Sequence, residues 1–133
     1  MNLNIYIETS IKAPARKQNG VVGIVLQAGN TDATKTLFEK VENVTKNNAD
    51  VIALMKATSH ISSHAEGILI HTSSLYVNQC IVSMRKNGRF CGTKYTEEWQ
   101  SIFEILKNHE FDVVLNQPNE YRGWLQQEVE RRR

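Results

Sequence analysis

Apolar side chains occupy every second position over residues 2–10, which read NLNIYIETS. A period of two is typical of a β-strand with one buried face and one more polar face. This strand ends by presenting the carboxylate of Glu8. Two further alternating runs, at 21–27 and 36–41, are separated by the turn-rich residues 28–33. The first third of the chain therefore predicts three strands in an antiparallel meander.

The pattern becomes helical in the middle of the chain. Residues 47–61 carry apolar side chains at helical spacing, and Asp50 lies near the start of this predicted helix. The apolar run 67–71 has the length of a central strand. Ser73 and Ser74 are suitable N-caps for a second helix. Because a strand, a helix and another strand follow one another, we expect a crossover connection and parallel pairing.

Two more helices and one strand are predicted in the last third of the chain. Thr96 is expected to cap a helix that has Glu97 and Glu98 in its first turn, where negative charge suits the helix dipole. Residues 111–115 are a fifth strand candidate, and a final helix is expected over 121–129. Four aromatic residues lie on apolar helical stripes, so we expect them to pack in the core: Tyr76, Trp99, Tyr121 and Trp124.

Length and charge narrow the interpretation. With 133 residues, 41% of them hydrophobic, the chain is predicted to form a single domain over residues 1–133. The formal net charge of +2 is small, but acidic residues are absent from 9–31 and from 67–96. These two windows contain the cations Lys12, Arg16, Lys17, Arg85, Lys86, Arg89 and Lys94. They are either solvated loops or a surface that contacts phosphate groups.

The two cysteines, Cys80 and Cys91, lack the spacing of a metal site, and Cys80 lies on an apolar helical stripe. No apolar leader precedes the first strand, and no apolar run approaches membrane-spanning length. We therefore expect a reduced, cytoplasmic protein without a membrane partner.

The predicted order of three strands, helix, strand, two helices, strand and helix resembles that of the type 1 ribonuclease H family over nearly the whole chain. The matching segments are IYIETS, TKNNADVIALMKA, IHTSSLYV, RKNGRF, EEWQSIFEIL and NEYRGWLQQE. They match, in turn, the strand that ends in Asp-Gly-Ser, the first helix, the Thr-Asp-Ser-x-Tyr-Val segment, the start of the basic handle, the Trp-bearing helix and the Asn-Glu-x-x-Asp final helix. The resemblance implies an α/β fold of the ribonuclease H kind. Its five-stranded mixed sheet would have three antiparallel strands, then two parallel crossover strands, with helices on both faces.

The family cleaves the RNA strand of RNA–DNA hybrids with two divalent ions, Mg²⁺ or Mn²⁺, held by four carboxylates. Paired ions of this kind stabilise the attacking and leaving oxygens of an in-line displacement. Carried over one at a time, the first two positions fall on Glu8 and Asp50, which remain acidic. The third falls on Ser73 and the fourth on Gly123, and neither supplies a charged ligand. The resemblance thus implies a depleted catalytic site in which Glu8 and Asp50 are the remaining metal ligands.

Two residues are candidates to replace the missing ligands. Glu120 lies one helical turn before Gly123, and His71 shares a strand face with Ser73 because they are two residues apart. A neutral histidine suits a transition metal better than Mg²⁺. The alternative is that neither residue binds a metal ion: Glu120 would then be a surface acid and His71 a partly buried residue.

Three functions remain open. The first is a nucleic-acid-binding module for RNA–DNA hybrid or double-stranded RNA, with weak or no hydrolytic activity. Its binding residues would be Lys12, Arg85, Lys86, Arg89 and Lys94. The second is an active metal-dependent ribonuclease H with an altered ligand set. The third is a protein-interaction module that keeps only the fold.

Overall fold

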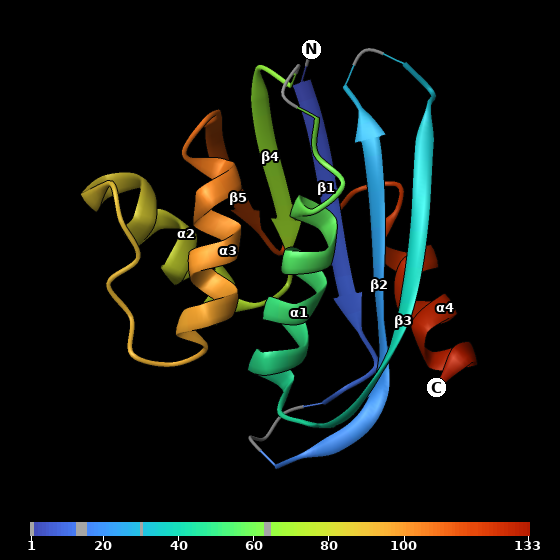
Figure 1. The fold of residues 1–133 in the computed structure, drawn as a ribbon. Helices are drawn as coiled ribbons and strands as arrows, with labels where there is room; N and C mark the ends of the chain where they lie inside the picture. The colour runs from blue at the N-terminus through green and yellow to red at the C-terminus, as the bar shows by residue number, and fades with distance from the viewer. Residues whose placement is uncertain (1, 13–15, 30, 63–64) are drawn as a thin grey trace.

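The structure is a computed structural model that describes residues 2–12, 16–29, 31–62 and 65–133. The described residues form five strands and four helices (Figure 1). The strands are β1 (Asn2–Thr9), β2 (Gln18–Ala28), β3 (Thr34–Val44), β4 (Gly67–Thr72) and β5 (Glu110–Leu115). The helices are α1 (Lys46–Thr58), α2 (Leu75–Asn87), α3 (Thr96–Leu106) and α4 (Arg122–Arg132).

The strands form one mixed sheet in the order β3-β2-β1-β4-β5. β2 is antiparallel to both β1 and β3, and β4 is parallel to both β1 and β5. The predicted meander, the parallel crossover strands and the five-stranded mixed sheet are confirmed. Since β1 and β4 are adjacent and parallel, their carboxyl ends meet at one edge of the sheet.

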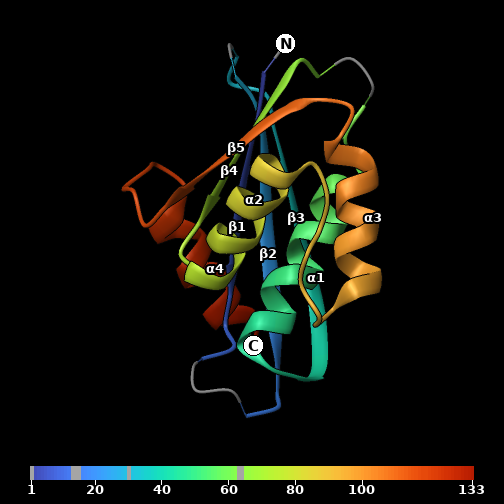
Figure 2. The ribbon, with the colours of Figure 1, turned by 90° about the vertical axis from the view of Figure 1, so that its left-hand side faces the viewer.

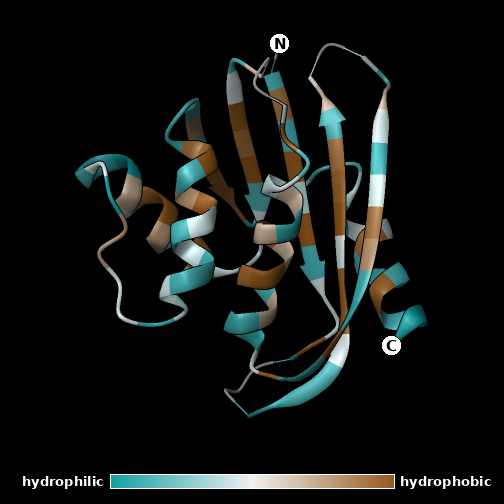
Figure 3. Cartoon of the chain, in the orientation of Figure 1, coloured by the Kyte–Doolittle hydropathy of each residue, from teal (hydrophilic) through white to brown (hydrophobic). Residues whose placement is uncertain are grey.

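The sheet separates two layers of helices. α1, α2 and α3 lie on one face and α4 lies on the other (Figures 1 and 2). Because side chains alternate along a strand, Ile5 and Ile7 pack in the larger core with α1, and Tyr6 packs with Leu125 of α4. Figure 3 shows brown, apolar segments along the strands of the sheet. None of the described helices is long and apolar enough to cross a membrane.

Two predictions about local structure are wrong. Thr96 is the first residue of α3, and the N-cap is Tyr95, which has a positive φ of 54° and makes no capping hydrogen bond. The hydroxyl of Tyr95 instead lies 2.9 Å from Oγ1 of Thr45, the N-cap of α1. Trp124 is 46% exposed, because α4 buries only a narrow face toward the sheet. Trp99, in contrast, is fully buried as predicted.

Candidate functional site

Two buried carboxylates lie where strand β1 meets helix α1. Glu8 is near the carboxyl end of β1 and is 7% exposed, and Asp50 is in the first turns of α1 and is 2% exposed. Burial raises the pKa of Glu8, and the negative charge of Asp50 raises this pKa further. The two acids that the sequence singled out are therefore close enough to interact electrostatically.

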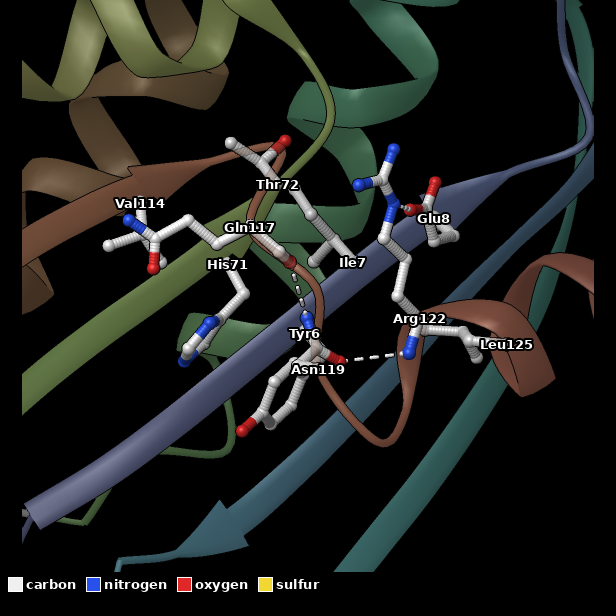
Figure 4. A pocket seen from close by; sticks show the side chains of 10 residues that line it. All are labelled: Tyr6, Ile7, Glu8, His71, Thr72, Val114, Gln117, Asn119, Arg122 and Leu125. Atoms are coloured by element: carbon white, nitrogen blue, oxygen red, sulfur yellow. Dashed lines mark hydrogen bonds and ion pairs between the residues drawn. The ribbon is translucent and has the colours of Figure 1, made fainter.

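Glu8 is surrounded by hydrogen-bond donors of the protein itself. Ser73, just after β4, donates to Oε2 of Glu8 over 3.1 Å. From helix α4, Gln126 donates to Oε1 over 3.4 Å, and Nε of Arg122 lies 3.7 Å from the same oxygen (Figure 4). Both carboxylate oxygens of Glu8 therefore already have partners within the chain.

Asp50 has its own cation within the same helix. Nζ of Lys46 lies 2.7 Å from Oδ2 of Asp50, one helical turn earlier, and the Ser74 side chain hydrogen-bonds the same carboxylate. Burial nevertheless raises the pKa of Asp50, against the lowering effect of Lys46. The second carboxylate, like the first, thus has a basic residue beside it.

The other candidate ligands do not join this pair. Gly123 lies in the first turn of α4 and has no side chain, and a Cβ placed on it would meet no heavy atom within 4 Å. Glu120 is exposed, and its carboxylate interacts with Tyr121. The role of Glu120 as a metal ligand stays a prediction, without a contact to Glu8 or Asp50 that supports it.

His71 belongs to a polar network on the α4 side of the sheet. Its ring stacks on Tyr6 with 4.2 Å between centroids, and its Nε2 lies 3.0 Å from Oδ1 of Asn4. Asn4 in turn donates to Gln27 over 2.8 Å. Because the amide nitrogen of Asn4 donates to Gln27, the amide oxygen of Asn4 faces His71 and must accept a hydrogen bond from a proton on Nε2. Burial lowers the pKa of His71, which favours the neutral form of the ring.

A small pocket lies between Glu8, Arg122 and the stacked ring of His71 (Figure 4). Its volume is about 10 Å³, which is enough for about one water molecule. The pocket is therefore too small for a nucleotide or another organic ligand. Any larger ligand must approach Glu8 and Arg122 from the molecular surface.

The metal pair that the family resemblance implies does not fit these residues. Mg²⁺ takes about six oxygen ligands in near-octahedral geometry, and its sites draw on carboxylates whose charge opposes that of the ion. Here Glu8 and Asp50 are the only acids at the four carried-over positions, and both already hold protein donors. In the part of the chain that the structure describes, no group of three or more histidines, cysteines or acids could hold a metal ion.

The predicted nucleic-acid-binding cations lie in two places. Lys12 follows β1 and makes an ion pair of 3.4 Å with Glu130 of α4. Arg85 and Lys86 are in the last turn of α2, and Arg89 and Lys94 lie in the segment between α2 and α3. All five side chains belong to exposed residues, and Arg85 lies 3.6 Å from Asp112 of β5.

The segment between α2 and α3 is anchored to the helical layer. The ring of Phe90 stacks on Trp99 with 5.6 Å between centroids, and Tyr95 packs edge-on against Tyr76. Trp99 also donates from Nε1 to the hydroxyl of Tyr76 over 3.1 Å. Phe90 and Tyr95 therefore hold the segment against the helices, and the exposed cations Arg89 and Lys94 each precede one of these two aromatic residues.

The sequence analysis missed three residues that contact the carboxylates: Lys46, Arg122 and Gln126. The Lys46 contact had a local signal, since a lysine four residues before an acid faces it on a helix. The contacts of Glu8 with α4 had none, because Gln126 lies 118 positions away in the sequence.

Comparisons with known proteins agree with the fold. The sequence matches no protein family model and no curated protein. Among solved structures, the chain is similar to the RNase H1 of the halophilic archaeon Halobacterium salinarum NRC-1, with a TM-score of 0.72, 16% identity and 100% of both chains covered. It is also similar to the prototype foamy virus protease-reverse transcriptase, with a TM-score of 0.68 and 19% identity, over 98% of this chain and 20% of that one. These likenesses, together with the order and pairing of the five strands, establish that the chain has a ribonuclease H-like fold.

Proposed function

We propose that this chain is a nucleic-acid-binding module for RNA–DNA hybrid or double-stranded RNA, with weak or no hydrolytic activity. The observation that carries the proposal is the pairing of each remaining carboxylate with a basic residue of the chain. Glu8 lies beside Arg122, and Asp50 lies beside Lys46. In a two-metal hydrolase, carboxylates at such positions hold the ions, and a basic residue beside each carboxylate competes with a cation for it.

The absence of two carboxylates also favours weak or absent hydrolysis. Ser73 supplies a neutral hydroxyl and Gly123 supplies no side chain at the two other carried-over positions. Each missing carboxylate removes a ligand and also a negative charge that would hold a divalent cation. We expect the affinity of the site for Mg²⁺ or Mn²⁺ to be low, and hydrolysis to be weak or absent.

Exposed cations support nucleic-acid binding. Arg85, Lys86, Arg89 and Lys94 lie in a stretch without acidic residues, and Phe90 and Tyr95 fix the backbone that carries the last two. The ion pair between Arg85 and Asp112 is largely exposed, so it is weak enough for a phosphate group to replace it. Contacts of this kind read the shape and charge of a duplex rather than its sequence.

Fluorescence-anisotropy titrations with labelled RNA–DNA hybrid, double-stranded RNA and double-stranded DNA test this proposal. We expect hybrid or double-stranded RNA to bind, with an affinity that falls steeply between about 50 mM and about 200 mM salt. The triple variant Arg85→Glu/Lys86→Glu/Arg89→Glu should lose most of this binding.

The matched control is Lys35→Glu/Lys40→Glu/Lys107→Glu, which changes the net charge by the same amount at exposed residues elsewhere. Equal losses in the two triple variants would indicate attraction by net charge alone. Absence of duplex binding at low salt would contradict the proposal and favour the protein-interaction module.

A further inference from the structure

We infer that Lys46 and Arg122 bind the phosphate backbone of the nucleic acid directly, in the place that divalent ions would otherwise take. This inference rests on the proposed function and deepens it. It starts from the misfit between the metal pair and the residues present: the positive charge beside Glu8 and Asp50 comes from the chain itself. Binding should then need no divalent cation.

Arg122 is held so that part of its guanidinium remains available. Its Nε faces Glu8 at 3.7 Å, and one terminal nitrogen, Nη2, donates to Oδ1 of Asn116 over 3.2 Å. Asn119 accepts a hydrogen bond of 2.9 Å from the backbone nitrogen of Arg122 and so fixes the start of α4. In the described part of the chain, no hydrogen bond engages Nη1.

The surface position of Arg122 suits an anion that arrives from solvent. The side chain is 32% exposed, and Figure 4 shows its terminal nitrogens directed away from Tyr6 and His71. A guanidinium presents its donors in a planar fork, which matches two oxygens of a phosphate. The hydrogen bond from Nη2 to Asn116 holds the guanidinium in place, so Arg122 loses little conformational freedom when it binds.

Lys46 offers a second cation at the same site. It is the first residue of α1, and its side chain is 29% exposed. An ammonium group has three N–H donors, and Asp50 takes one of them. Both Lys46 and Arg122 lower the pKa of Glu8, so both act on the same carboxylate.

The charges of this group explain how it can accept a phosphate. Two carboxylates without counter-ions would repel a nucleic acid backbone, whereas Lys46 and Arg122 cancel the charges of Asp50 and Glu8. Each carboxylate lies beside one N–H group of its cation, and the remaining N–H donors are free for the phosphate oxygens.

The inference makes a prediction opposite to that of a metal site. Glu8→Gln removes a negative charge and releases Arg122, so hybrid binding should become about two- to tenfold tighter. At a metal-dependent site the same change would remove a ligand and weaken binding. Arg122→Gln should weaken binding by about three- to tenfold.

The test measures hybrid binding at constant ionic strength in EDTA and in Mg²⁺, for the unchanged protein, Glu8→Gln, Arg122→Gln and Lys46→Gln. The double variant Glu8→Gln/Arg122→Gln shows whether Arg122 acts by direct contact. The double variant is compared with Glu8→Gln: if Arg122→Gln weakens binding only because Glu8 is left unpaired, the double variant binds as tightly as Glu8→Gln, and the inference is wrong. The control is Lys107→Gln. Lys107 lies beside Asn2 and Gly67, the first residues of β1 and β4, and so at the end of these strands that is away from Glu8.

The outcomes separate this inference from the proposed function. Equal affinity in EDTA and in Mg²⁺ supports direct phosphate contact, provided that Lys46→Gln weakens it and that Arg122→Gln weakens it both in the unchanged protein and in Glu8→Gln. Binding that disappears in EDTA leaves the proposed function intact and overturns the inference. An affinity that Arg122→Gln and Lys46→Gln leave unchanged has the same meaning. No binding in either buffer overturns both.

Discussion

Ser73 and Glu8 share a hydrogen bond of 3.1 Å, although 65 positions separate them in the sequence. Ser73 follows β4 and Glu8 lies near the end of β1, so the parallel pairing of these strands brings them together. The third carried-over position therefore lies beside the first, as the family resemblance implies. At this position the resemblance implies a carboxylate that would share a cation with Glu8, and in this chain a hydroxyl donates to Glu8 instead.

Restoring the two missing acids should create a divalent cation site. In Ser73→Asp/Gly123→Asp, the new carboxylate at position 73 lies beside Glu8, and the one at position 123 enters open space. An acid in the first turn of α4 also suits the helix dipole. We expect Mn²⁺ affinity, measured by calorimetry, to rise about tenfold or more over the unchanged protein.

The matched control for the restored site is Ser73→Asn/Gly123→Asn, which adds similar volume without charge. If both double variants bind Mn²⁺ equally well, the carried-over positions do not form a metal site in this chain.

Glu8→Gln should stabilise the folded protein at neutral pH. The pKa of Glu8 is raised above 4.5, chiefly by burial, so the folded state favours the protonated form. This contribution is fully present below about pH 4.5 and is lost as the pH rises through the folded-state pKa. Gln mimics the protonated form of Glu8. The melting temperature of Glu8→Gln should therefore exceed that of the unchanged protein by roughly 3–5 °C at pH 7, which corresponds to about 1 kcal/mol in the free energy of unfolding.

This difference between Glu8→Gln and the unchanged protein should vanish near pH 4, where Glu8 is protonated in both the folded and the unfolded state. Thermal unfolding followed by circular dichroism across this pH range checks it. A variant that is less stable at pH 7 would mean that the contacts of ionised Glu8 with Arg122 and Ser73 outweigh its burial.

His71 should make the fold sensitive to mild acid. Burial lowers the pKa of His71 in the folded protein, so below about pH 6.5 the unfolded chain binds a proton more readily. The contribution of neutral His71 is therefore present above this pH and is lost as the pH falls. In His71→Gln, the melting temperature should fall less steeply between about pH 7.5 and about pH 5.5. Parallel curves for the two proteins would show that His71 is not the titrating group.

Gly92→Ala should loosen the segment that carries the exposed cations. A Cβ at Gly92 would collide with the ring of Phe90, which stacks on Trp99. We expect faster hydrogen exchange over residues 88–95 and a loss of stability of about 1 kcal/mol. The control Gly123→Ala meets no neighbouring atom and should stabilise α4 by about 0.5–1 kcal/mol. Unchanged exchange in Gly92→Ala would contradict the anchoring role of Phe90.

The sequence predicted most of the fold because each element carries its own period. Strand β1 and helix α1 are recognisable from spacing alone, and parallel pairing follows from the crossover order. The errors concern residues whose environment depends on distant parts of the chain. Trp124 follows the apolar stripe of α4, but Leu125 and Val129 are the buried residues of this helix. Tyr95 rather than Thr96 is the N-cap of α3, and its hydroxyl contacts that of Thr45, the N-cap of α1.

The candidate site was predictable only in part. Glu8 and Asp50 could be placed by resemblance to family positions, and Ser73 with them. The neutralisation of Glu8 by Arg122 depends on the docking of α4, which no local pattern indicates. It is this pairing that bears most on function.

The most direct test of the account is a cleavage assay on a labelled RNA–DNA hybrid with Mg²⁺ or Mn²⁺, at a salt concentration where the protein binds the hybrid. Glu8→Gln serves as a control against a contaminating nuclease. We expect the hybrid to remain bound and intact with both proteins. Cleavage by the unchanged protein that disappears in Glu8→Gln would contradict the account and establish an active ribonuclease H with an altered ligand set.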